Sequence, residues 1–253
     1  MKKIAYFLEF ILIKILFILF RLIGYRLSSN LGFFIGKTIG PIFRSKKMII
    51  KNLEKAKIKH SDDPSKIASN VLGNYGRIFA EYVYLKKFRN NDLKKFVSID
   101  GLEHLENLKK YNKKAVFISG HFNNFELMAM EIEKAGIDLA AIYRPLNNIF
   151  LNETMEKIRK ENICKNQIRK GRAGSREIIK NLIEGKSIAL MIDQRVREGE
   201  KVKFFNNLAT TTTIPAQLVK KYNCELVPIY IERKKSNYFK IYISEPIKIS
   251  KTK

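Results

Sequence analysis

The chain has 253 residues, a formal net charge of +25 and a hydrophobic fraction of 45%, enough for one α/β domain with a substantial core and an appendage. Its two cysteines, Cys164 and Cys224, lack metal-ligand spacing and disulfide density, so we expect a reduced, cytosol-facing protein with no metal site and no cofactor. The charge suits an anionic membrane or an acidic protein, although an AT-rich genome would also enrich lysine; no zinc finger, basic heptad region or RNA-binding aromatic signature indicates nucleic acid.

A nearly unbroken apolar run begins at Ile4 and is long enough to cross a bilayer. Glu9 and Lys14 interrupt it, and their cost nearly cancels the gain from the apolar residues, so a transmembrane helix and an interfacial helix both remain open. We expect one membrane-associated helix up to about Leu27, within a membrane-anchoring segment 1–27. The more positive flank follows the run, which predicts a main domain on the cytoplasmic side, with basic residues that suit anionic lipids.

The next segment, 28–90, is expected to be helical and close to the membrane. Gly32, Gly36 and Gly40 recur every four residues among apolar side chains, a pattern typical of closely packed helices. Two further helices are predicted, a basic amphipathic one over 44–59 and one over 64–85 that is capped by Asp63.

From 91 to 253, short apolar runs alternate with helical patterns, which predicts an α/β domain with a mixed, largely parallel sheet flanked by helices. Strands are expected at 97–99, 115–119, 138–143, 187–192, 225–232 and 238–244. Helices are expected at 102–111, 123–135, 148–162, 175–184 and 214–222.

The strand 115–119 leads through Gly120 to His121, which therefore lies at the carboxyl edge of the predicted sheet, where ligands bind in open α/β folds. Glu126 falls in the first turn of the following helix. Its carboxylate can orient the His121 ring and leave the other ring nitrogen free as a base for a substrate hydroxyl. Two plainer interpretations stay open: Glu126 completes a capping box with Asn123, or His121 is a turn residue held by backbone.

Other polar residues follow predicted strands. Arg144 and Asp193 each come directly after one, and Arg159 lies on a helix between them. Arginines there can bind phosphate or carboxylate, whereas a solvated helix face for Arg159 and a turn for Asp193 are the alternatives. The threonines of 209–213 can bind an anion or simply cap a helix. We expect His121, Arg144 and Asp193 along one sheet edge, around a cleft open to the membrane.

Four short blocks in a fixed order support a family resemblance. They are Gly120-His121-Phe122 with Glu126, Tyr143-Arg144-Pro145 with Asn148 and Arg159, Gly185-Lys186 leading to Asp193-Gln194, and Phe204-Phe205 with 209–212, 226–228 and Arg233. Together they resemble the bacterial lipid A late acyltransferases, the lauroyl and myristoyl transferases of lipopolysaccharide biosynthesis, within the lysophospholipid acyltransferase superfamily. That family continues with a tryptophan-rich segment, whereas this chain has no tryptophan and stops at Lys253, so we expect a fragment or a chain without that segment.

The resemblance implies an O-acyltransferase that moves a fatty acyl chain from an acyl carrier protein thioester to a hydroxyl of a phosphorylated glycolipid, the lipid A precursor. It implies a location at the cytoplasmic face of the bacterial inner membrane. The catalytic residues would be His121 and Glu126, and the substrate-binding residues would be Arg144, Arg159, Asp193, Gln194, Thr211 and Thr212. The alternatives are a glycerophospholipid (lysophosphatidate-type) acyltransferase and an inactive membrane-bound lipid-binding homologue.

Overall fold

The structure is a computed structural model, and it describes residues 2–235 and 237–248. The chain divides into two compact units, so the expected division into segments 1–27, 28–90 and 91–253 stays a prediction. The first unit comprises Met1–Ile13, Leu85–Gln194 and Thr213–Lys253, and the second comprises Lys14–Tyr84 and Arg195–Thr212.

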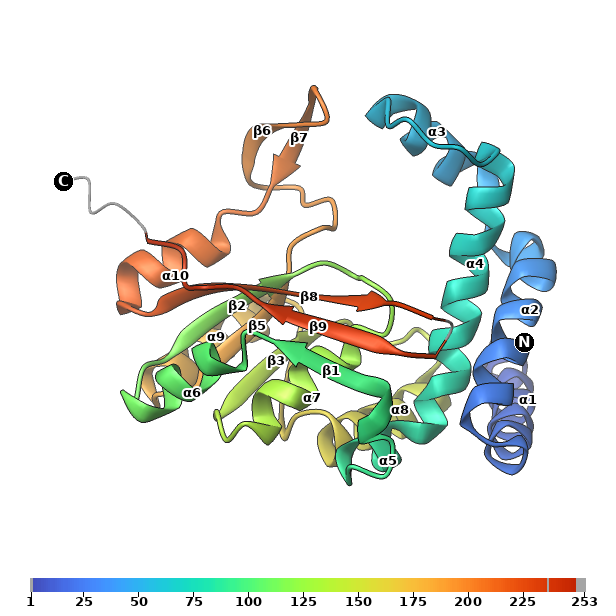
Figure 1. Cartoon of the computed structure of the whole chain (residues 1–253), viewed down its shortest axis with the longest axis horizontal. Coiled ribbons are helices and arrows are strands. Elements are labelled where there is room, and N and C mark those ends of the chain that lie inside the picture. Colours follow the sequence, from blue (N-terminus) through green and yellow to red (C-terminus); the bar gives the residue numbers. More distant parts are fainter. Residues whose placement is uncertain (1, 236, 249–253) are drawn as a thin grey trace. The chain divides into compact units, whose positions relative to one another are not determined.

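A seven-stranded sheet in the order β1-β9-β8-β2-β5-β3-β4 forms the centre of the first unit (Figure 1). Neighbouring strands run parallel except for the antiparallel pair of β8 and β9. The predicted mixed, largely parallel sheet is therefore confirmed. The strands are β1 (Val97–Asp100), β2 (Ala115–Ser119), β3 (Leu139–Tyr143), β4 (Asn166–Arg169), β5 (Ser187–Met191), β8 (Glu225–Arg233) and β9 (Phe239–Ile243).

Helices flank this sheet, as expected for α/β alternation. Most begin within a few residues of the predicted starts, and α9 begins three residues earlier than its predicted start at Ser175. The helices of the unit are α5 (Leu85–Arg89), α6 (Leu102–Lys110), α7 (Glu126–Lys134), α8 (Ile149–Asn162), α9 (Arg172–Ile183) and α10 (Ile214–Tyr222), with a 3-10 turn, η2 (Lys94–Phe96).

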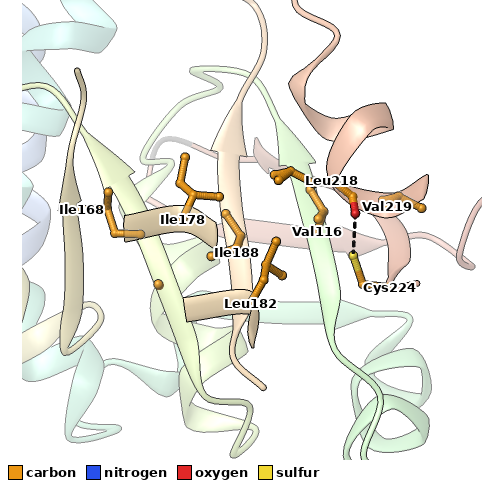
Figure 2. Close-up of a cluster of buried hydrophobic side chains, with 9 residues drawn as sticks. Val116, Ile168, Ile178, Leu182, Ile188, Leu218, Val219 and Cys224 are labelled. Carbon is orange, nitrogen blue, oxygen red and sulfur yellow. Dashed lines mark hydrogen bonds between the residues drawn. The ribbon is translucent and has the colours of Figure 1, made fainter. Parts of the chain in front are cut away.

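One face of the sheet is closed by α9 and α10. Figure 2 shows Leu182 of α9 and Leu218 of α10 packed with Val116 and Ile188 from the two central strands. Cys224 belongs to the same cluster, and its thiol donates to the Leu218 carbonyl across 3.8 Å (Figure 2). Burial raises the pKa of the Cys224 thiol. Burial likewise raises the pKa of Cys164 to about 12. Both cysteines are free and buried, so they serve as packing residues.

The second unit is mainly helical. It contains α2 (Tyr25–Phe43), α3 (Lys46–Ala56), α4 (Pro64–Glu81), a 3-10 turn, η1 (Tyr82–Tyr84), and the antiparallel strands β6 (Glu200–Phe204) and β7 (Asn207–Thr211). The glycine repeat packs α2 closely against α4: a Cβ on Gly32 would lie 2.4 Å from the Gly76 carbonyl oxygen, and one on Gly36 would lie 2.5 Å from the Leu72 oxygen. The expected close-packing helix is confirmed. Asp63 caps α4 by accepting from the Lys66 amide at 3.0 Å.

The N-terminal apolar run forms α1 (Lys2–Ile23). The expectation of one helix to about Leu27 is wrong at its end, because Gly24 has a left-handed φ of 82° and a second helix starts at Tyr25. Within the part of the chain that the structure describes, no helix combines the length and the apolar character needed to cross a membrane.

Candidate active site

The register of two parallel strands brings His121 and Asp193 together. Ser119 of β2 lies opposite Met191 of β5, and the Ile192 amide still donates to the Ser119 carbonyl at 2.9 Å beyond the strand end. His121 and Asp193 each follow two residues after that matched pair. The two side chains therefore meet at the carboxyl edge of the sheet, the edge at which α/β proteins bind ligands.

One carboxylate holds both the ring and the backbone of His121. The Nδ1 atom lies 2.8 Å from Oδ1 of Asp193, and the His121 amide donates to Oδ2 of the same carboxylate at 2.9 Å. An ionised carboxylate only accepts hydrogen bonds, so in the neutral ring the proton lies on Nδ1 and Nε2 carries the lone pair. The side-chain amide of Gln194 lies 3.5 Å from Nε2 and can donate to it.

This arrangement can act as a general base. The His121 side chain is 28% exposed and that of Asp193 is 41% exposed, so Nε2 is accessible to a substrate. The Phe125 ring meets the imidazole edge-to-face, with centroids 5.0 Å apart, and limits its rotation. A positioned imidazole with a carboxylate behind it can take a proton from a hydroxyl and hold the resulting positive charge.

Glu126 is held in a different pair. Its Oε1 accepts from Nε of Arg159 at 3.0 Å and lies 3.0 Å from Nη2 of the same guanidinium. The guanidinium also lies over the Tyr143 ring, 5.6 Å from its centroid. The hydrogen-bond partner of Nδ1 of His121 is therefore Asp193 and not Glu126. The catalytic role expected for Glu126 and the substrate-binding role expected for Arg159 stay predictions.

The capping-box interpretation is wrong. The helix α7 begins at Glu126 with Phe125 as its N-cap residue, not at Asn123. Asn123 has a left-handed φ of 42°, so it cannot belong to the helix, and its side chain donates to the Ile231 carbonyl at 3.1 Å.

The Tyr143-Arg144-Pro145 block is braced from α8. The Tyr143 hydroxyl donates to Glu156 at 2.5 Å, and Nη2 of Arg169 lies 2.9 Å from the other oxygen of that carboxylate. Burial alone raises the pKa of Glu156, but the hydrogen bonds from Tyr143, Arg169 and Asn152 outweigh it and lower the pKa to about 2. Arg144 itself is exposed, directly after β3. Since β3 is parallel to β5, and β5 to β2, the predicted shared edge for His121, Arg144 and Asp193 is confirmed, and the expected cleft open to the membrane stays a prediction.

The first half of α1 joins this unit through Asn148. The side chain of Asn148 is buried, and its Oδ1 accepts from the Phe150 and Leu151 amides in the first turn of α8. Its Nδ2 donates to the Tyr6 carbonyl at 2.8 Å and to Oε2 of Glu9 at 3.0 Å. Phe7 packs edge-to-face on Phe150, with centroids 5.6 Å apart. Glu9, the acid that interrupts the apolar run, is thus a hydrogen-bond partner of Asn148, the residue that caps α8.

The threonines expected to bind an anion or cap a helix lie partly on a strand and partly at the start of α10. Thr211 lies on β7, where it pairs with Glu200, and its hydroxyl donates to the Ala209 carbonyl at 3.3 Å. The N-cap of α10 is Thr213, with no side-chain capping bond. Thr211 and Thr212 belong to the second compact unit, so their substrate-binding role stays a prediction. Among residues 2–235 and 237–248, no three acidic, histidine or cysteine side chains are grouped to hold a metal ion.

Asp193 lies at the sheet edge that its position after a strand predicts, and the substrate-binding role expected for it stays a prediction. The signal for its pairing with His121 is present in the sequence. Each residue stands two positions after the last residue of a buried strand, so adjacent parallel strands in register bring the two side chains together. What the sequence does not state is that β2 and β5 are neighbours.

The fold and the site define a class: α/β proteins with a histidine held by a carboxylate at the carboxyl edge of a largely parallel sheet. A sequence profile of the bacterial lipid A biosynthesis acyltransferases matches residues 1–253, and the chain belongs to this family. A search of curated proteins finds no match. Among solved structures, the crystal structure of the 1-acyl-sn-glycerophosphate (LPA) acyltransferase PlsC from Thermotoga maritima is similar, with a TM-score of 0.40 and 14% identity over 88% of this chain and 85% of that one.

Proposed function

We propose that this acyltransferase moves a fatty acyl chain from an acyl carrier protein thioester to a hydroxyl of a lipid A precursor. The observation that supports it best is the His121–Asp193 pair, with Nδ1 and Oδ1 2.8 Å apart, in a chain of the lipid A biosynthesis acyltransferase family. Such a pair leaves the lone pair of Nε2 to act on a hydroxyl that replaces the long 3.5 Å contact from Gln194, without a covalent enzyme intermediate.

In the proposed reaction, Nε2 of His121 takes the proton of the acceptor hydroxyl as its oxygen attacks the thioester carbonyl. Asp193 stabilises the imidazolium that forms, because its carboxylate already holds Nδ1–H. Collapse of the tetrahedral intermediate expels the carrier-protein thiolate, which takes the proton from the imidazolium. The products are an acyl ester and a free thiol, and the histidine returns to its starting state.

Charge and exposure support the proposed partners. Arg144 is exposed at the same sheet edge and suits a phosphate of a glycolipid acceptor. The net charge of +25 suits an acidic carrier protein and an anionic membrane. Along α1, large apolar side chains form an exposed stripe, which suits an interfacial helix at the cytoplasmic face of the inner membrane. The stripe consists of Ile4, Phe7, Leu8, Ile11, Leu12, Ile15, Ile18, Leu19 and Leu22.

The test is transfer of a labelled acyl group from acyl carrier protein to two acceptors offered together, a lipid A precursor and lysophosphatidate. The proposal expects label on the lipid A precursor with the wild-type chain and none with His121→Ala. Label on lysophosphatidate alone would support the glycerophospholipid alternative. Binding of the acceptor without transfer, unchanged in His121→Ala, would instead support an inactive lipid-binding homologue.

A further inference from the structure

The hairpin of β6 and β7 exposes large apolar side chains on both of its faces. Val202, Phe204, Phe205 and Leu208 are 49%, 65%, 48% and 68% exposed. The two strands form a sheet of their own (Figure 1). A two-stranded ribbon is marginally stable in water by itself, and exposed apolar groups of this kind mark a surface that meets a partner.

The turn at the hairpin tip adds a second observation. Phe204 pairs with Asn207, so Phe205 and Asn206 alone make the turn, with φ of 46° and 59°. This is the conformation that usually calls for Asn or Gly, and a bulky residue adopts it at a cost. The Phe204 and Phe205 rings meet edge-to-face at the tip, 4.6 Å between centroids. An exposed aromatic residue in a strained turn suggests a role outside the fold.

Basic residues surround the apolar tip. Lys201 and Lys203 alternate with the apolar side chains of β6 and are exposed. The tip is also tied to the basic helix α3, because Nδ2 of Asn207 donates to the Lys55 carbonyl at 3.0 Å. No residue of α3 is buried, and Met48 on it is 64% exposed. The hairpin and α3 therefore offer apolar side chains with lysines beside them.

We propose that the tip of the β6–β7 hairpin inserts into the surface of an anionic membrane, as a contact additional to the α1 stripe. A fluid lipid layer can surround both faces of a thin ribbon, whereas a folded protein partner would cover one face and leave the other in water. Lysines with long aliphatic stems reach lipid phosphates while the aromatic rings enter the acyl region. The inference does not depend on the reaction that the protein catalyses.

The chain contains no tryptophan, so Phe204→Trp places a single fluorescent reporter at the tip. Mixed phosphatidylglycerol–phosphatidylcholine vesicles should shift its emission to the blue, and bromine in the acyl chains should quench it. Tyr111→Trp is the matched control, because Tyr111 is an exposed aromatic beside Lys110 outside the hairpin. Its emission should not change. Pure phosphatidylcholine vesicles should give at least a roughly tenfold weaker response, because the electrostatic attraction is lost.

An unchanged Phe204→Trp emission in the anionic vesicles would overturn the proposal, as would an equal shift of Tyr111→Trp. A shift caused by acyl carrier protein without vesicles would identify the hairpin as a protein contact and also overturn it. A fold-preserving variant gives a second measurement. Phe204→Thr with Phe205→Asn suits a strand and a left-handed turn, and should lower vesicle affinity by roughly tenfold or more. The control pair Ile183→Thr with Tyr111→Asn should leave the affinity unchanged. None of these measurements requires acyl transfer.

Discussion

Two pairs of charged or titratable side chains differ in their access to solvent, although His121 of one and Glu126 of the other are five residues apart in the chain. The His121–Asp193 pair has side chains that are 28% and 41% exposed, whereas those of Glu126 and Arg159 are 9% and 14% exposed. The first pair leaves a basic nitrogen open to substrate. The second is enclosed by the start of α7, by α8 and by the ring of Tyr143. Proximity to His121 in sequence therefore does not identify its partner.

The difference separates reactivity from support. An exposed pair can exchange a proton with a ligand, and folding removes little of its hydration. Removing one partner of a buried pair, in contrast, strongly destabilises the fold. We expect changes at His121 and Asp193 to affect turnover with little effect on stability. Changes at Glu126 should affect stability first.

The largest effect is expected from His121→Ala. Loss of the general base should lower the rate of acyl transfer by roughly 10²–10⁴ while the fold remains intact. The measurement is single-turnover transfer from labelled acyl carrier protein, with circular dichroism to check folding. His104→Ala is the matched control, because His104 lies on α6, outside the site, and should retain normal turnover. Near-normal turnover in His121→Ala would end the assignment of the exposed pair as the reactive one.

Asp193→Asn should lower turnover by roughly 10² or more, because the pair then loses its charge and its geometry. Two donors, the His121 amide and Nδ1–H, face the two carboxylate oxygens. Asparagine offers one acceptor, so one of these bonds must be lost or the ring must change tautomer and block Nε2. Asp138→Asn serves as the control, because Asp138 precedes β3 at the opposite end of that strand. Equal effects of the two substitutions would contradict a specific role for Asp193.

Glu126→Gln should lower the free energy of unfolding by about 3–5 kcal/mol, because it leaves the Arg159 guanidinium largely buried without its charged partner. Acyl transfer should fall with it. Urea unfolding gives the stability, and Glu161→Gln is the control from α8, since its pair with Lys157 is exposed and worth about 0.5 kcal/mol.

The double substitution Glu126→Leu with Arg159→Met distinguishes support from catalysis. Replacing both charges with apolar side chains should recover most of the stability. If turnover returns as well, Glu126 acts only through the fold. If stability returns without turnover, Glu126 or Arg159 takes part in the reaction or in substrate binding, as the sequence motifs predict, and the contrast between the two pairs fails.

The sequence predicted most of the sheet because its strands are short apolar runs with clear ends. It missed β4, an edge strand in which only Ile168 is buried. It also missed the β6–β7 hairpin, whose Phe205-Asn206 turn lacks the glycine that usually signals a two-residue loop. Both omissions concern elements whose stability depends on neighbours rather than on their own hydrophobic pattern.

The candidate site was predicted in position but not in pairing. His121, Arg144 and Asp193 were placed at one edge because each follows a strand, and the parallel ladder confirms that reasoning. Which acid holds His121 depends on strand order and on the backbone of Asn123, whose left-handed conformation delays the helix start. Neither feature is encoded in a local pattern, so a short motif favoured Glu126.

The smallest effect is expected at a third acid, Glu156. Its pair with Arg169 is intermediate between the exposed and the buried pair, because the Glu156 side chain is 12% exposed and that of Arg169 is 67% exposed. Its pKa is lowered from the usual 4.5 to about 2, since the hydrogen bonds from Tyr143, Arg169 and Asn152 outweigh the effect of burial. A depressed pKa means that its stabilising contribution is complete above about pH 4.5 and disappears as the pH falls towards 2. That contribution should be about 3 kcal/mol.

The measurement is the difference in unfolding free energy between wild type and Glu156→Gln, taken at pH 6 and again at pH 3. The difference should shrink at the lower pH. At pH 3 the Glu156 carboxyl is largely protonated in the unfolded chain but still largely ionised in the folded protein, and this proton uptake stabilises the unfolded wild-type chain. Glu184→Gln provides the comparison: its pKa is also lowered, chiefly by a hydrogen bond from Lys186, but its carboxylate is exposed, so solvent screens the interaction and the same change of pH should have a smaller effect. Because Asn152 links Glu156 to the Leu146 amide, the same substitution should loosen the loop that presents Arg144. A difference that stays constant with pH would mean that burial, not charge, decides what an acid contributes beside this site.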